Sequence, residues 1–191
     1  MKSLKFKIVS ALITASLFVP AISVNAAGAT SGANNLGNGL TKQQKIANRQ
    51  EWQQYKAAIT PKKDTIKQNH QTITSLRKEV SEKRATIKTL TKGIKQNKKK
   101  LTDDDLSKVK TQLQTIKDET SALSSTKGAV TKDFQTIKTD VKNRNFQDAE
   151  VQLDNVISIQ NTRVDGLKKL STDMDTLINL LQTVSANVKT S

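Results

Sequence analysis

The sequence predicts an all-α protein, namely an elongated antiparallel three-helix coiled-coil bundle preceded by a shorter, Pro-kinked N-terminal helix. Three observations lead to this fold class. Apolar residues recur every seven positions through the first half of the 191-residue chain. No segment alternates apolar and polar residues as a half-buried strand does. Helix-start signals also divide the region after residue 61 into three segments of similar length, which short connections would fold up, down and up.

Residues 1–26 have the features of a Sec signal peptide. A basic start, MKSLKFK, is followed by an apolar stretch that contains Pro20, and small residues at Val24 and Ala26 predict cleavage after Ala26. The apolar stretch is short for a membrane-spanning helix, and the chain has no cysteine for a lipid anchor or a disulfide. We therefore expect a protein that is secreted or associated with the cell envelope of a bacterium, with no lipid or transmembrane anchor after cleavage.

Pro61 is the expected boundary within the mature chain. Residues 27–39 are small, polar and rich in glycine, which predicts a flexible leader. Residues 40–60 are expected to form the short N-terminal helix, and residues 61–191 the bundle. Thr60 and Pro61 resemble a cap and a first helical residue, but the heptad pattern continues through them. A kinked continuation and a folded-back helix therefore both remain open.

From Leu40 onward the sequence carries an uninterrupted apolar line, which we label position a of a heptad. Its members are Trp52, Ile59, Ile66, Ile73, Val80, Ile87, Ile94 and Leu101. The d line is half polar and consists of Tyr55, Lys62, Asn69, Leu76, Lys83, Leu90 and Asn97. A complete a line beside a mixed d line predicts a narrow coiled-coil seam.

The second helix is predicted at about 103–142. Thr102 is a natural N-cap with Asp105 three residues later, and Asp103, Asp104 and Asp105 suit the positive end of the helix dipole. A metal site is the functional alternative for these carboxylates, but no further ligands are spaced to complete it. Gly128 is a weak point at which the apolar register nevertheless continues.

The third helix is predicted at about 146–188, with Asn145 as a possible cap and Asp148 in its first turn. Its apolar face is broader than those of the other two helices. We therefore expect it to be the most buried of the three.

The positive charge is concentrated in one segment. The chain has a formal net charge of +15, and residues 41–101 hold 17 basic and 4 acidic residues. Residues 102–143 are neutral overall, with 7 of each sign, and residues 144–191 hold 5 basic and 6 acidic residues. The first long helix is therefore the expected contact for anionic partners.

The basic residues line up at position e, beside the apolar seam. The predicted anion-binding track consists of Arg49, Lys56, Lys63, Arg77, Arg84 and Lys98, with His70 in the same column. The alternative is that these residues form ion pairs with acids of the second helix. The acids in the corresponding column are Asp105, Glu119, Asp133 and Asp140.

Catalysis is not expected. With one histidine and no cysteine, the sequence offers no thiol site, zinc cluster or histidine-based triad, and we predict no cofactor. Trp52 and Tyr55 share the apolar face, which indicates packing in preference to ligand stacking.

One short motif resembles a known family. LTKQQ, residues 40–44, is similar to the LTxxQ pattern of the Spy/CpxP family of exported helical stress chaperones. The resemblance implies ATP-independent binding of client proteins on a basic, partly apolar surface. A second copy of the motif is absent, because Leu101 and Thr102 are followed by aspartate, and Thr41 with Gln44 also forms a capping box. The long basic coiled coil is similar in style to the chaperone Skp.

Three functions are therefore expected candidates. The first is binding of an anionic cell-wall polymer or membrane surface by the basic helix. The second is an extracytoplasmic holdase for unfolded client proteins, and the third is a purely structural coiled coil. A homo-oligomer is possible in each case, and sequence-specific nucleic-acid recognition is not expected, because no recognition motif is present.

Overall fold

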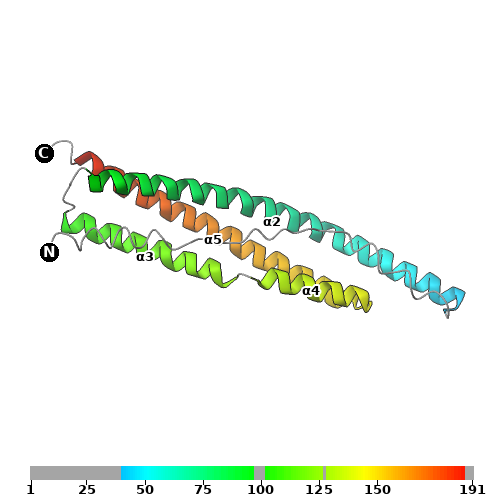
Figure 1. The fold of residues 1–191 in the computed structure, drawn as a ribbon. Helices are drawn as coiled ribbons and strands as arrows, with labels where there is room; N and C mark the ends of the chain where they lie inside the picture. Colours follow the sequence, from blue (N-terminus) through cyan, green and yellow to red (C-terminus); the bar gives the residue numbers. More distant parts are fainter. Residues whose placement is uncertain (1–39, 97–101, 127, 188–191) are drawn as a thin grey trace. The chain divides into compact units, whose positions relative to one another are not determined.

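The computed structural model describes residues 40–96, 102–126 and 128–187, and these residues are all-α (Figure 1). The helices are α2 (Lys42–Gln96), α3 (Asp103–Ser125), α4 (Ala129–Lys142) and α5 (Phe146–Asn187). The predicted signal peptide and flexible leader, together with Lys98 of the predicted track, lie outside the described residues. Among the described helices, none is long and apolar enough to cross a membrane.

The chain divides into two units, each built from three helical segments. The α3 unit contains residues 72–96 of α2, all of α3, and α5 from residue 163. The α4 unit contains α2 up to residue 71, all of α4, and α5 up to residue 162. Both α2 and α5 therefore contribute to each unit.

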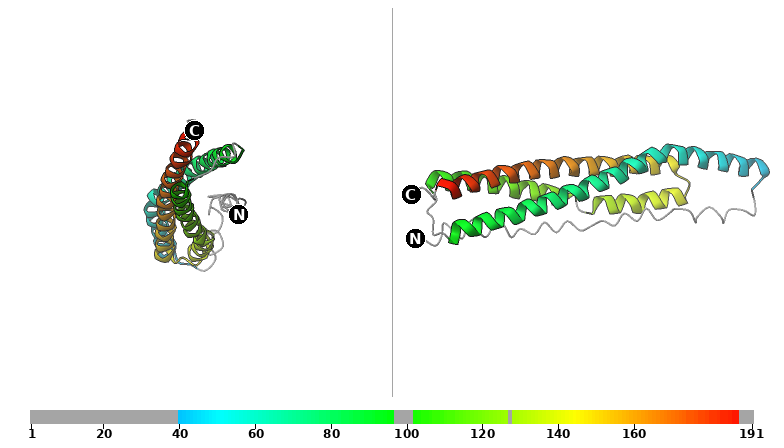
Figure 2. Two further views of the ribbon diagram at one scale, coloured as in Figure 1. Left: turned by 90° about the vertical axis from the view of Figure 1, so that its left-hand side faces the viewer. Right: turned by 90° about the horizontal axis from the view of Figure 1, so that it is seen from above.

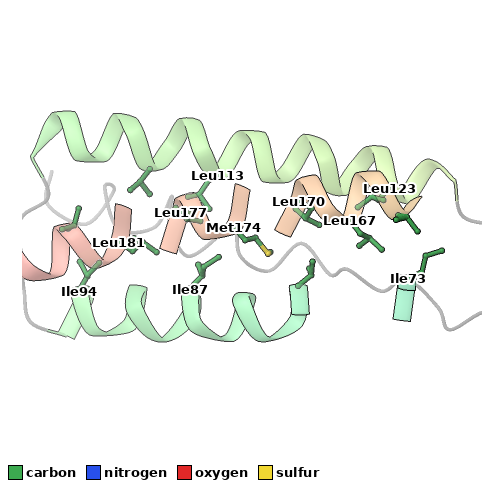
Figure 3. Packing of buried hydrophobic residues seen from close by; sticks show 14 residues of the cluster. Ile73, Ile87, Ile94, Leu113, Leu123, Leu167, Leu170, Met174, Leu177 and Leu181 are labelled. Atoms are coloured by element: carbon green, nitrogen blue, oxygen red, sulfur yellow. The ribbon is translucent and has the colours of Figure 1, made fainter. Parts of the chain in front are cut away.

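Each unit has its own apolar core. In the α3 unit the a-line residues of α2 meet Val109, Leu113 and Leu123 of α3 and a row of α5 residues (Figure 3). That row is Val164, Leu167, Leu170, Met174, Leu177, Leu181 and Val184. In the α4 unit the buried residues are Tyr55, Ile59, Ile66, Val130, Ala149, Leu153 and Val156. The predicted a line from Ile59 to Ile94 is thus buried throughout.

Side-chain pairs give the helix directions. Polar contacts between α2 and α5 join residues 88 or 92 apart in both units, as in Lys83 with Ser171 and Asn69 with Asn161, so these two helices are parallel. Between α3 and α5 the order reverses, because Gln112 contacts Asp173 whereas Glu119 contacts Lys169. The predicted all-α bundle of three long helical segments is confirmed.

The polar d positions of α2 make the contacts that define this register. Lys62 Nζ lies 2.6 Å from Asp154 Oδ2, and Asn69 Nδ2 donates to Asn161 Oδ1 at 2.8 Å. In the α3 unit, Lys83 Nζ lies 2.6 Å from Asp175 Oδ2 and 2.7 Å from Glu79 Oε1. Polar groups at seam positions favour one register, because a slip of one heptad would leave them unpaired.

Lys83 also donates to the buried Ser171 hydroxyl at 2.6 Å. Burial alone would lower the pKa of Lys83, but its hydrogen bonds with Asp175 and Glu79 outweigh burial, and the pKa is raised. The ammonium group therefore remains charged within the seam.

Pro61 does not end a helix. It lies inside α2, which runs without interruption for 55 residues (Figure 2). Thr60 is not an N-cap, because its hydroxyl donates to the Lys56 carbonyl one turn back at 2.8 Å. A proline inside a helix costs about 3 kcal/mol. Packing of Tyr55 and Ile59 before it, and of Ile66 after it, in one apolar cluster offsets that cost.

The prediction of a single second helix was wrong. α3 ends at Ser125 and α4 begins at Ala129, so that two helices replace the expected span 103–142. Gly128 has φ 87°, in the left-handed region where glycine has no steric cost. The apolar register continues past Gly128, but hydrophobic spacing does not report the backbone conformation of a single residue. The break between α3 and α4 could therefore not be predicted from this pattern.

The predicted helix starts are otherwise confirmed. Thr41 and Gln44 form the reciprocal capping box, with Thr41 N–H donating to Gln44 Oε1 at 2.8 Å and Gln44 N–H to Thr41 Oγ1 at 3.2 Å. Asp105 N–H donates to Thr102 Oγ1 at 3.0 Å. α5 begins at Phe146, directly after Asn145, as expected.

Candidate anion-binding surface

The first half of the predicted track lies on the surface of the α4 unit. Arg49, Lys56 and Lys63 are all exposed. The ammonium group of Lys56 lies 5.3 Å from the ring centroid of Trp52, which is a cation–π distance. Trp52 itself packs against Tyr55 at 5.5 Å and Phe146 at 5.5 Å, so the aromatic residues serve packing.

The second half of the column turns toward the interior. Arg77 and Arg84 are only partly exposed, and burial lowers the pKa of each guanidinium below its usual value. One heptad further on, Thr91 is 8% exposed, and its hydroxyl donates to the Ile87 carbonyl at 2.8 Å. The column is therefore not uniformly exposed along α2.

The drift of a helix against a seven-residue count explains this change. A straight α-helix rotates by about 20° per heptad relative to a 3.5-residue repeat. Near the start of α2 the d position is buried, as Tyr55 shows, and e is exposed at Lys56. Near its end d is only half-buried at Leu90, and e is buried at Thr91. The packed stripe thus moves from a and d toward a and e.

The same geometry adds three basic residues that the predicted track left out: Lys42, which is one heptad before Arg49, and Lys45 and Lys67, which counting in sevens assigns to other columns. At about 100° per residue, Lys42, Lys45 and Lys67 lie in one sector of about 60° with Arg49, Lys56 and Lys63. We call these six exposed residues the cationic face. A helical wheel with 3.6 residues per turn would have found them from the sequence.

The cationic face is not neutralised by the described part of the chain. None of its six residues forms an ion pair with a described residue, and no acidic residue falls in their sector. The face extends over residues 42–67 of α2, which are 25 steps of 1.5 Å, or about 37 Å. It is thus a row of solvated positive charges on one side of a helix in the α4 unit.

Glu119, one of the four acids in the corresponding column, does not pair with α2. Glu119 instead lies 3.0 Å from Lys169 of α5. Burial first, and a hydrogen bond with Asp173 second, raise the pKa of the Glu119 carboxyl above its ordinary value, against the opposing effect of Lys169. The interhelical ion pairs that α2 lysines make use d positions and acids of α5.

Among residues 40–96, 102–126 and 128–187, no cluster of three or more potential metal-ligating side chains occurs. Asp105 acts at the helix start through its backbone N–H, as the capping interpretation requires.

Comparisons with known proteins give no relative. No protein-family model matches the chain, and no curated protein or solved structure shows significant similarity to it.

Proposed function

We propose that this chain is a secreted, non-enzymatic helical binding protein of the bacterial cell envelope, and that the cationic face of α2 engages anionic polymers or surfaces. The single observation that supports this proposal is that face, with six exposed basic residues and no ion pair to a described residue. The predicted signal peptide places the chain where cell-wall polymers and membrane surfaces are available as partners.

The distribution of charge over the helices agrees with this proposal. α2 contains 14 lysine and arginine residues and 4 acids, whereas α5 contains 3 basic residues and 6 acids. The six acids of α5 could pair with far fewer basic residues than α2 contains. Exposed ion pairs also contribute at most about 1 kcal/mol each. Summed attraction to a polyanion uses all of the unpaired charges at once.

The holdase alternative has less support. A client-binding surface needs exposed apolar area, and Ile46 and Val151, each 52% exposed, are the large apolar residues that stand out among the described residues. Ile46 lies between Lys45 and Arg49 in sequence, so the cationic face has one apolar neighbour. The described a-line residues of α2 pack within the apolar core of one unit or the other.

The experiment compares two triple variants that remove the same number of charges. Arg49, Lys63 and Lys67 are replaced by Gln on the cationic face. The control replaces Lys117, Lys132 and Lys138, which are exposed on α3 and α4, by Gln. Binding is measured to phosphatidylglycerol vesicles and to purified poly(glycerol phosphate), by sedimentation and by calorimetry.

We expect the face variant to bind about 100-fold more weakly, because each basic residue near an anionic surface contributes about 1 kcal/mol. The control variant should change little. Binding of the unmodified protein should fall steeply between 0.1 and 1 M salt, over which the Debye length shrinks from about 10 Å to about 3 Å. Equal weakening by both variants would show that only net charge matters, and unchanged binding would reject the proposal.

A further inference from the structure

The cationic face is a single row of charges that runs lengthwise along α2. Its six members lie in one sector of about 60° on the helix. Between residues 42 and 67, Thr60 is the only other residue in that sector at about 100° per residue. The whole row belongs to the α4 unit. The face is therefore narrow, long and free of apolar side chains.

The spacing of the charges matches that of an extended phosphodiester chain. Successive members of the face are about 4.5 to 10.5 Å apart along the axis, with a mean of about 7.5 Å, at 1.5 Å per residue. A glycerol phosphate repeat linked through its two terminal oxygens contains six backbone bonds, like two extended residues, and is about 7 Å long. On average, one phosphate can therefore lie opposite each basic residue.

The side-chain types also suit a linear ligand. Five of the six members are lysines, and Arg49 is the only arginine. A lysine ammonium group is a compact, hydrated point charge that does not fix the orientation of its partner. A single compact anion could contact only neighbours such as Lys45 and Arg49, about 6 Å apart along the axis. Only a long ligand can use the whole row.

A lipid bilayer fits this face less well than a linear polymer does. Helices that lie in a membrane interface bury an apolar face among the lipids. In the α4 unit the apolar side of α2 packs in the core through Tyr55, Ile59 and Ile66. Ile46 is 52% exposed but lies outside the sector of the face.

Single-stranded nucleic acid has a similar phosphate spacing, but it is bound by aromatic stacking as well as by charge. The two aromatic residues nearest to the face, Trp52 and Tyr55, both pack on Phe146, with ring centroids 5.5 Å and 4.7 Å away. The sector itself contains no aromatic residue. The face therefore favours a phosphodiester polymer without bases.

We propose that the cationic face binds a linear, base-free phosphodiester polymer of the poly(glycerol phosphate) class, which lies lengthwise along α2 with about one phosphate per basic residue. This inference rests on the proposed binding of anions by the same face. It replaces a general attraction to anions by a defined ligand length, because a row of about 37 Å accommodates about six repeats of about 7 Å.

The first turns of α2 give this binding mode a second readout. Contacts of α2 with α5 in the α4 unit join residues 88 or 92 apart, so the start of α5 at Phe146 lies level with residues 54–58. Residues 42–50 extend past that level and are exposed nearly throughout (Figure 1). A helix end with so few tertiary contacts has low local stability. A polymer that lies along the whole row should therefore slow hydrogen exchange of the amides of residues 46–50.

The test measures calorimetric affinity of the full mature chain for glycerol phosphate oligomers of about two, four, six and twelve units, of which six span the face at about 7 Å each. Lys42→Gln with Lys67→Gln shortens the row to residues 45–63, about 27 Å or four units. The matched control, Lys117→Gln with Lys138→Gln, removes two exposed charges elsewhere. Phosphatidylglycerol vesicles and thymidine oligonucleotides of equal phosphate content are titrated in parallel.

We expect the affinity of the unmodified protein and of the control to rise at least tenfold from two to six units and then to level off. In the shortened variant the affinity should level off at four units. The slope of log K against log salt concentration should be about −4 for six units and about −1.4 for two, at about −0.7 per phosphate contact. Six-unit oligomers should slow exchange at residues 46–50, and two-unit oligomers should not.

Four results would overturn the inference. An affinity independent of oligomer length, or one that levels off at the same length in all variants, would show that the polymer does not follow the row. Tighter binding per phosphate to vesicles would assign the face to membranes, and tighter binding to oligonucleotides would show that bases contribute. These three results leave the proposed function intact. Absence of binding to every anionic probe would reject both.

Discussion

A substitution at Tyr55 tests whether the segment of α2 before Pro61 is part of the apolar core. Its side chain is 4% exposed and stacks on Phe146 of α5, with ring centroids 4.7 Å apart and an interplanar angle of 23°. The centroid of the Trp52 ring lies 5.5 Å from that of the Tyr55 ring. Replacing Tyr55 by Ala removes the aromatic group at the centre of this cluster while leaving the helix propensity of α2 favourable.

The expected loss follows from the burial of the ring. Truncating a buried aromatic residue to alanine costs about 3–5 kcal/mol, and aromatic pairs contribute about 0.5–1.5 kcal/mol beyond the buried area. Trp52 and Phe146 are only partly buried, so they can move into the space that is left. We therefore expect a value near the lower end, about 3 kcal/mol.

Urea unfolding measures this loss, followed by fluorescence and by circular dichroism. Trp52 is the only tryptophan of the chain and lies in the α4 unit, so its emission reports on that unit. Tyr55→Phe keeps the ring and should lose much less stability. Gln53→Ala, an exposed change on the same helix, should alter stability by less than about 0.5 kcal/mol. A loss below about 1 kcal/mol for Tyr55→Ala would refute the view that α2 before Pro61 is integral to the core.

Two further predictions concern titrating groups. Burial, and then the charges of two carboxylates, raise the pKa of Tyr55 from 10.0 to about 12. Since the folded state favours the neutral phenol, the contribution of Tyr55 to stability should be constant below pH 10 and fall as the pH rises toward 12. Tyr55 is the only tyrosine, so absorbance at 295 nm gives its midpoint directly, and a midpoint near 10 would contradict its burial. Glu119 has a pKa raised above 4.5, so the folded state binds its proton more tightly and stability is lost as the pH rises above 4.5. Glu119→Gln should therefore raise the melting temperature above that of the unmodified protein more at pH 7 than at pH 4. Asp118→Asn, a change at an exposed neighbour, should not show this difference.

Helix class, helix starts and the buried line of α2 were predictable from the sequence because each depends on local chemistry or on periodicity. The capping box at Thr41 and the N-cap at Thr102 need only residues three apart. The a line from Ile59 to Ile94 is buried because one apolar residue per heptad faces the neighbouring helices. The start of α5 at Phe146 follows a connection of only three residues after α4.

The same periodicity could not decide the backbone at two places. Pro61 favours a helix boundary, yet the apolar contacts on both sides of it keep α2 continuous. Gly128 leaves the apolar register intact, yet its φ of 87° separates α3 from α4. In the first case packing overrides a local preference, and in the second a backbone conformation is invisible to a hydrophobic pattern.

The candidate sites depended most on tertiary structure. The sequence by itself determined that the positive charge is concentrated on the first long helix and that it borders the apolar seam. Only the tertiary structure decided that Arg49, Lys56 and Lys63 face solvent while Arg77 turns inward. The physical reason is that a helix of 3.6 residues per turn drifts against a seven-residue count, so equivalent heptad positions meet different surroundings at its two ends.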